Sequence, residues 1–218
     1  MRLTTLVNNA GVVPETRMET KDGNEVSMAT MAGGTFLLTS LLLPVLRKEK
    51  KARVVNVSSA GMYTTKLNVA NIQCDQDSTY DGVFAYAHAK RAQVILTEMF
   101  QKKCNSSLSS NVTFHSMHPG WSDTPGVRGK SMEWFNSKLE GNLRSGEQGA
   151  DTILWLAVAE DEQLDKDGGQ FWFDRAVVRQ HMTWAWTKEK EGEREALWER
   201  LCVLFQHVPE LSLNSVRK

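Results

Sequence analysis

The stretch Arg53-Val54-Val55-Asn56-Val57-Ser58-Ser59 decides the fold of this chain. It is an apolar run interrupted by one asparagine, and it stops at two serines followed by Ala60-Gly61. A short run of this kind, rich in β-branched residues and closed by turn residues, predicts a strand buried on both faces. Three further runs predict strands in the same way: Leu3–Val7, Val112–Met117 and Gly169–Phe173.

Helical patterns fill the segments between these strands. Asp22-Gly23-Asn24-Glu25 and Ser145-Gly146-Glu147-Gln148 have the form of capping boxes, so we expect each to open a helix, the second one running to Ala159. Two more helices are expected, one from Ala85 to about Lys103 and a final amphipathic one marked by Leu197, Leu201, Leu204 and Phe205. The alternation predicts an α/β fold, with a parallel sheet covered by helices on both faces and ligands bound beyond the carboxyl ends of the strands.

The composition narrows the class of protein. The 218 residues hold 26 Lys plus Arg against 26 Asp plus Glu, so the formal net charge is zero. Because nucleic-acid binding depends on excess positive charge, we expect no nucleic-acid partner. The apolar stretch Phe36–Leu46 is too short to span a bilayer, so no transmembrane segment is expected. The sequence shows no signal-peptide pattern, and its scattered cysteines (Cys74, Cys104 and Cys202) predict no metal site and an intracellular, cytoplasmic protein.

Tyr86 and Lys90 stand four residues apart in an expected helix, so their side chains share one face. A phenol has an unperturbed pKa of about 10, and we expect the neighbouring ammonium to lower that pKa toward the range of an acid/base catalyst. Ser59, at a strand end, can donate a hydrogen bond to a carbonyl oxygen. Together these groups suit proton transfer to a carbonyl that receives a hydride, although each one alone is more often a packing pair or a turn.

Four motifs occur in order at the expected strand ends and on the helix that follows. Asn8-Asn9-Ala10-Gly11, Val55–Ser59, Tyr86 with Lys90, and Pro119–Thr124 resemble the N-N-A-G turn, the serine strand, the Y-x-x-x-K pair and the P-G-x-x-x-T turn of the short-chain dehydrogenase/reductase family. Further phrases resemble a vertebrate member of that family over roughly Leu6 to His181. The resemblance implies a Rossmann-like domain over residues 1–181, followed by a charged helical extension over residues 182–218.

The resemblance also implies an NAD(P)-dependent oxidoreductase that acts on an alcohol or carbonyl compound. Tyr86 is implied as the general acid/base, Lys90 as the group that lowers its pKa and holds the nicotinamide ribose, and Ser59 as the residue that orients the substrate oxygen. NAD and NADP are not distinguished. Contacts with the cofactor are implied for Asn8, Ala10, Gly11, Tyr86, Lys90, Pro119, Gly120 and Thr124.

The sequence departs from the family's pattern in two ways. It contains no T-G-x-x-x-G-x-G turn, which in the family holds the cofactor pyrophosphate, so the chain is expected to be N-terminally truncated, to correspond to family strands 4–7 and to bind NAD(P) weakly. Leu3–Val7 is then expected to form an exposed edge strand. Met31 stands where the family has an asparagine that holds a water of the proton relay; the alternative is that Met31 fills core space.

Four bulky side chains follow the P-G turn, in a stretch that covers the substrate in this family: Trp121, Met132, Trp134 and Phe135. They favour a lipophilic substrate, although packing against the final helices explains them equally well. The small-residue face of the Tyr86 helix resembles the family's dimer-forming helix, so a homodimer through this helix is one expectation and close packing within the chain is the other.

Two hypotheses on function therefore remain open. The first is an oxidoreductase of the short-chain type. The second is a catalytically impaired form that acts, if at all, by association with a full-length protein, and a product that does not fold stably is a third possibility.

Overall fold

The computed structural model describes residues 2–76, 78–105, 111–139, 141–166, 168–209 and 211. Its centre is a sheet in the order β1-β2-β3-β4-β5. The strands are β1 (Thr5–Asn8), β2 (Ala52–Val57), β3 (Val112–His118), β4 (Phe171–Phe173) and β5 (Ala176–Val177). The four predicted strands pair in parallel, so the α/β fold is confirmed.

The sheet also has a fifth strand, β5, which the sequence did not predict. β5 pairs antiparallel with β4, with Phe173 opposite Ala176. The two residues between the strands, Asp174 and Arg175, both have positive φ, which is the backbone that a two-residue hairpin turn requires. At the other end, β1 is an edge strand as expected, and its Val7 is partly exposed.

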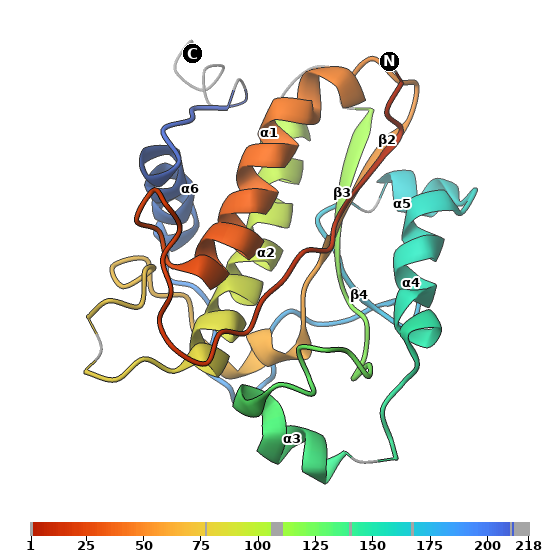
Figure 1. Cartoon of the computed structure of the whole chain (residues 1–218). Coiled ribbons are helices and arrows are strands. Elements are labelled where there is room, and N and C mark those ends of the chain that lie inside the picture. The colour runs from red at the N-terminus through yellow and green to blue at the C-terminus, as the bar shows by residue number, and fades with distance from the viewer. Residues whose placement is uncertain are drawn as a thin grey trace.

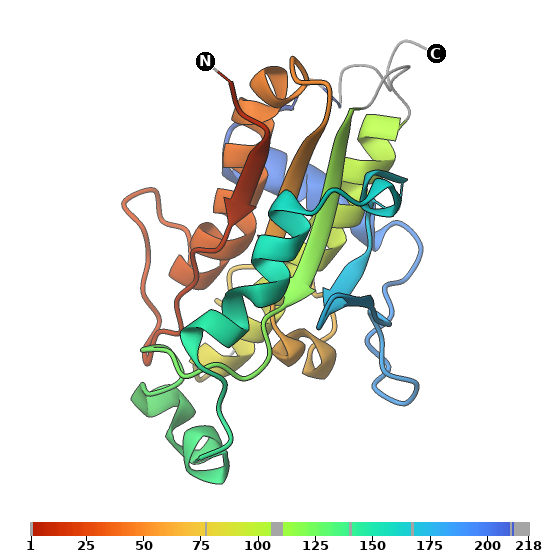
Figure 2. The same ribbon diagram turned by 90° about the vertical axis from the view of Figure 1, so that its right-hand side faces the viewer.

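Helices cover both faces of the sheet (Figures 1 and 2). On one face lie a π-helical segment that continues into α1, then α2 and α6; on the other lie α4 and α5. The bounds are Met28–Gly33 for the π-helical segment, Gly34–Leu46 for α1, Gly82–Asn105 for α2, Gly146–Val158 for α4, Glu162–Lys166 for α5 and Glu193–Leu204 for α6. Near the carboxyl ends of the strands lie two 3-10 segments, η2 (Ala60–Thr64) and η3 (Lys130–Met132), and α3 (Glu133–Lys138).

The two expected helix starts have different outcomes. The capping box at Ser145 is confirmed: its hydroxyl accepts from the Gln148 N–H at 3.2 Å, and the Gln148 side chain accepts from the Ser145 N–H at 2.9 Å. The predicted box at Asp22 does not form. Gly23 lies in a turn with φ of 77°, and the carboxylate of Glu25 instead accepts from the N–H groups of Ser27 and Met28, at 2.9 and 2.7 Å. A longer acidic side chain at the helix start therefore satisfies the free N–H groups.

Met28–Leu46 forms a continuous helix of 19 residues with a mean hydropathy of 1.7. By length and composition this helix is able to cross a membrane, whereas the apolar stretch Phe36–Leu46 alone is too short to do so. Half of this segment is buried in the fold. Buried core helices reach the same length and hydropathy, so these two properties do not separate a core helix from a membrane-spanning one.

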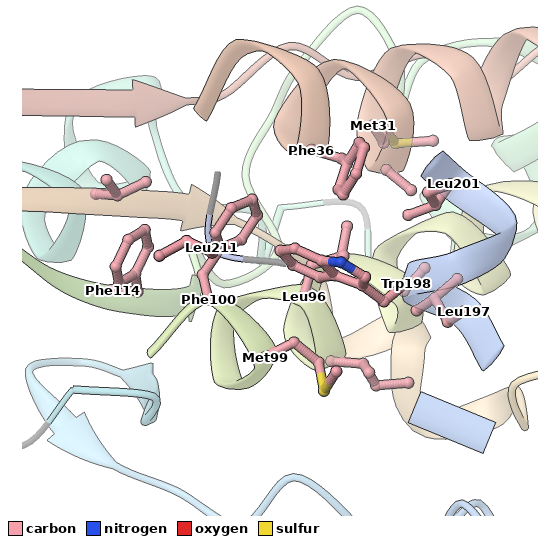
Figure 3. Close-up of a cluster of buried hydrophobic side chains, with 14 of the residues drawn as sticks. Met31, Phe36, Leu96, Met99, Phe100, Phe114, Leu197, Trp198, Leu201 and Leu211 are labelled. Carbon is pink, nitrogen blue, oxygen red and sulfur yellow. The ribbon is translucent and has the colours of Figure 1, made fainter. Parts of the chain in front are cut away.

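The main core lies between one face of the sheet and the helices α1, α2 and α6 that cover this face (Figure 3). Trp198 of α6 meets the rings of Phe36 and Phe100 nearly at right angles, with centroids 5.1 and 4.9 Å apart, and Phe100 stacks on Phe114 at 5.4 Å. The charged final helix therefore contributes an aromatic side chain to the core. Met31 belongs to this cluster and is fully buried, so it fills core space.

Candidate active site

The expected catalytic residues lie at the carboxyl ends of the strands. Ser59 follows β2 and caps η2, where its hydroxyl accepts a hydrogen bond from the Gly61 N–H at 3.1 Å. Tyr86 and Lys90 stand on the first turns of α2. A Cβ added at Gly61 would lie 3.5 Å from the Ser59 hydroxyl and 4.0 Å from the Tyr86 ring, which shows how closely the turn and the helix approach.

The structure brings the three side chains together. The Ser59 hydroxyl lies close enough to the Tyr86 phenol to act to lower the pKa of that phenol. The Lys90 Nζ lies 5.6 Å from the centroid of the Tyr86 ring and donates to the Val57 carbonyl at 2.6 Å. The predicted juxtaposition of Tyr86 and Lys90 on one helical face is confirmed.

The electrostatics of this site differ from the expectation. Burial lowers the pKa of Lys90 to about 7, because its ammonium sits in a position only 2% exposed to solvent. Burial raises the pKa of Tyr86, and the Ser59 hydroxyl opposes that rise only in part. The predicted lowering of the Tyr86 pKa by Lys90 is therefore wrong for this structure, because burial of the phenol has the largest effect on that pKa and raises it.

The Asn8–Gly11 turn passes beside the Lys90 ammonium. A Cβ at Gly11 would lie 3.5 Å from both the Lys90 Nζ and the Met31 sulfur. Asn8 itself is buried, and its amide nitrogen donates to the side chains of Asn56, at 2.8 Å, and Thr39. Since Asn8 is buried at the strand end, the exposed residues Asn9, Ala10 and Gly11 are the part of the turn open to a ligand.

The Pro119–Thr124 turn is fixed by an arginine that the sequence did not single out. Gly120 has φ of 80°, and a Cβ there would lie 2.6 Å from the Arg144 Nε. The Arg144 backbone bonds to Trp121 and Asp123, each at 2.8 Å, and its side chain pairs with Asp174. Arg144 therefore positions a turn whose Pro119 is half-buried and whose Thr124 is exposed.

His118 is a second residue that the sequence reasoning missed. Its Nδ1 accepts from the Ala60 N–H at 3.1 Å, and its ring stacks on Phe173 at 5.2 Å. Burial, helped by the charge of Arg144, lowers the pKa of His118 to about 4. The neutral ring thus ties the turn after β2 to the end of β3. Its place directly before Pro119 was a signal, although no partner could be named without the fold.

The residues expected to cover the substrate differ in their exposure to solvent. Trp121 is half-buried and meets the His118 ring edge-on at 5.3 Å, while Trp134 on α3 is 74% exposed. Met132 is half-buried, and the side chain of Phe135 lies outside the described part of the structure. A shallow cavity of about 640 Å³ opens at the opposite edge of the sheet, between Thr5 and Glu160, and takes no part in this site.

The small-residue face of α2 is covered within the chain. Ala85, Ala89 and Ala92 are each at most 1% exposed, and the last two belong to the main core. This packing favours the second of the two expectations for that face, and a homodimer through α2 stays a prediction.

A Rossmann-like α/β sheet with a serine, a tyrosine and a lysine gathered at its carboxyl edge defines a class of domain built for nicotinamide cofactors and acid/base chemistry. Residues 1–133 match the family model of short chain dehydrogenases. The chain belongs to that family.

Known proteins support the same family. Dehydrogenase/reductase SDR family member 12 of Homo sapiens is 41% identical over 205 residues, which are 94% of this chain and 62% of that protein. Retinol dehydrogenase 11 of Homo sapiens is 31% identical over 202 residues, covering 92% of this chain and 60% of that protein. This chain thus spans about three fifths of these relatives' length. A crystal structure of an uncharacterised protein from Mycobacterium Paratuberculosis superposes with a TM-score of 0.72 at 25% identity, covering 95% of this chain and 69% of that one.

Proposed function

We propose that this chain carries the acid/base centre of an NAD(P)-dependent oxidoreductase that interconverts a lipophilic carbonyl compound and its alcohol. The observation that carries the proposal is the convergence of Ser59, Tyr86 and Lys90: a Cβ at Gly61 would lie 3.5 Å from the Ser59 hydroxyl and 4.0 Å from the Tyr86 ring, and the Lys90 Nζ lies 5.6 Å from the centroid of that ring.

The residues beside this centre fit the ribose end of a dinucleotide. An ammonium has three N–H donors, and Val57 takes one of those of Lys90 among the described residues. The remaining donors can hold ribose hydroxyls, and the neighbouring Gly11 carries no side chain to block a close approach. The resemblance of Pro119, Gly120 and Thr124 to the family's P-G-x-x-x-T turn supports a role at the nicotinamide end.

Each side chain has a task set by its own chemistry. Bound NAD(P)H supplies a hydride to the carbonyl carbon. Tyr86, whose raised pKa keeps it protonated at neutral pH, donates its proton to the carbonyl oxygen. Ser59 orients that oxygen, and the Lys90 ammonium stabilises the phenolate left on Tyr86. With a pKa of about 7, Lys90 loses this charge above neutral pH, so reduction should slow there.

The substrate class rests on two supports. Retinol dehydrogenase 11, a relative, is named for a lipophilic alcohol. Trp121 and Met132 place large apolar side chains in the segment that follows the P-G turn, at the same edge of the sheet as Tyr86. Both favour an apolar substrate over a sugar or a hydroxy acid.

The test combines binding with turnover. We expect NADH or NADPH to bind the purified chain by fluorescence titration, and retinaldehyde to be reduced faster than acetaldehyde. Tyr86→Phe should leave dinucleotide binding intact and lower reduction about 10²- to 10⁴-fold, since it removes the proton donor. Tyr63→Phe is the matched control, because the Tyr63 hydroxyl donates to the Arg179 carbonyl and is not joined to Ser59.

Two outcomes would contradict this function. One is failure of both dinucleotides to bind at millimolar concentration, and the other is unchanged turnover in Tyr86→Phe.

A second candidate is association without catalysis. The edge strand β1, with Val7 partly exposed, favours it because an edge presents unpaired backbone groups to another strand. A chain that binds no dinucleotide but forms a complex with a longer copy of this protein in size-exclusion chromatography would support this candidate. In that case Val7→Lys should weaken the complex.

A further inference from the structure

A loop between β5 and α6 exposes large apolar side chains. Met182, Trp184 and Trp186 are 60%, 81% and 84% exposed, and no charged residue lies between Met182 and Thr187. We call Met182–Thr187 the tryptophan loop. Tryptophan side chains are seldom left this open to water, so the exposure of two in three consecutive residues calls for a partner.

The loop has a rigid base. The buried Arg91 of α2 donates to the Gln180 carbonyl at 2.6 Å on one side, and to the Thr187 carbonyl at 3.4 Å and the Glu189 carboxylate at 2.7 Å on the other. Within the loop, the Ala185 N–H donates to the Met182 carbonyl at 3.1 Å. The loop is therefore held at both ends and closed by a turn, and its tryptophans are presented by a fixed scaffold.

Exposed cations flank the loop. Arg179 precedes it, and Lys188 and Lys190 follow it. In the described part of the chain none of these three side chains takes part in an ion pair, and Glu191 is the nearest exposed acid in sequence. An uncharged aromatic tip between exposed cations matches the chemistry of a bilayer surface, where indole rings settle at the headgroup level and cations meet anionic headgroups.

The loop lies at the same edge of the molecule as Ser59. The Tyr63 hydroxyl donates to the Arg179 carbonyl at 2.5 Å, and Arg91 contacts the Met62 sulfur, so the loop's base packs on η2, which begins directly after Ser59. Figure 2 shows the segment as the mid-blue loop that projects at the lower right, beyond β4 and β5.

We propose that the tryptophan loop docks this chain on a lipid surface that carries anionic headgroups. Trp184 and Trp186 enter the interface, while Arg179, Lys188 and Lys190 contact the headgroups. The exposed tryptophans, the Arg91 bonds that fix the two ends of the loop and the flanking cations support this docking, which does not depend on the proposed oxidoreductase activity.

Vesicle flotation tests it. The chain should float with vesicles of phosphatidylcholine containing phosphatidylserine, and less with phosphatidylcholine alone. The double variant Trp184→Ser/Trp186→Ser should bind about tenfold or more weakly, because two large apolar side chains no longer enter the interface. Each of Lys188→Gln and Lys190→Gln should cost about fivefold on the anionic vesicles only.

The matched control is Leu154→Ser/Val158→Ser on α4, which removes two exposed apolar side chains, 60% and 74% exposed, on the opposite face of the sheet. It should float like the parent chain. The proposal fails if the parent chain does not float, or if the tryptophan variant floats equally well. It also fails if the tryptophan variant instead abolishes a concentration-dependent dimer seen by light scattering, since the loop would then be a protein interface. Circular dichroism checks that each variant is folded.

Discussion

Lys90 and Arg91 are neighbours on α2, both are buried, and their surroundings differ. Lys90 donates to a single carbonyl, that of Val57, and among the described residues no carboxylate pairs with it. Arg91 bonds to the Glu189 carboxylate, to His181 and to the carbonyls of Gln180 and Thr187 on the two sides of the tryptophan loop. The helix α2 therefore presents a cation with few partners to the candidate active site and a cation with many partners to the base of the tryptophan loop.

The difference shows that two buried cations on one helix can have different roles, one in proton transfer and one in holding a loop in place. A lysine can lose its proton when burial makes the charge costly, so its pKa falls to about 7 and the group becomes usable in proton chemistry. An arginine stays charged, so burial is tolerated only when carboxylates and carbonyls surround it. We therefore propose that the lysine serves the reaction, whereas the arginine holds the loop.

The largest effect is expected from breaking the Arg91 cluster. Arg91→Met leaves the Glu189 carboxylate, only 2% exposed, without its main partner. The free energy of unfolding should fall by about 3–5 kcal/mol, measured by urea denaturation. A loss below about 1 kcal/mol would show that Arg194 and His181 hold Glu189 well enough without Arg91.

Lys90→Met should act in the opposite direction. Below pH 7 the lysine is charged in both the folded and the unfolded chain, so the folded state bears the full cost of the buried charge. Between pH 7 and about 10.5 only the unfolded chain keeps the proton, and the parent protein gains stability as pH rises. The variant should be about 2–4 kcal/mol more stable at pH 6 and equal near pH 10. A constant difference across that range would contradict the lowered pKa of Lys90.

His118 extends the comparison to a buried base near the same site. Its pKa falls from 6.5 to about 4 on folding, so the unfolded chain binds more protons between these values. The parent protein should therefore lose about 2–3 kcal/mol as pH falls from 6.5 to 4. His118→Asn, whose side chain can also accept from the Ala60 N–H, should show a flatter profile by thermal unfolding; identical slopes would assign the acid sensitivity to other groups.

The smallest effect is expected from Arg91→Lys. The charge is kept, but three donors replace five, and the planar guanidinium that bonds to Glu189 and to the carbonyls of Gln180 and Thr187 is lost. A cost of about 1–2 kcal/mol is expected in urea denaturation. A loss as large as that of Arg91→Met would mean that the hydrogen bonds, and not the charge, hold the cluster.

Much of the site was readable from local sequence. Strand ends put Ser59 and the Asn8–Gly11 turn at one edge, and the i, i+4 spacing put Lys90 beside Tyr86. The roles of Arg144 and His118 were not readable, because their partners lie far along the chain and are brought near only by the packing of α4 and β4 against the loop after β3.

The sequence by itself determined the α/β class, the parallel order of the first four strands and the identity of the chemical groups, because periodicity and strand-end motifs are local properties. Only the tertiary structure decided the protonation of those groups and the exposure of Trp184 and Trp186. The physical reason is that a pKa and an exposed fraction depend on desolvation, which is set by every segment packed around a side chain, including segments distant in sequence.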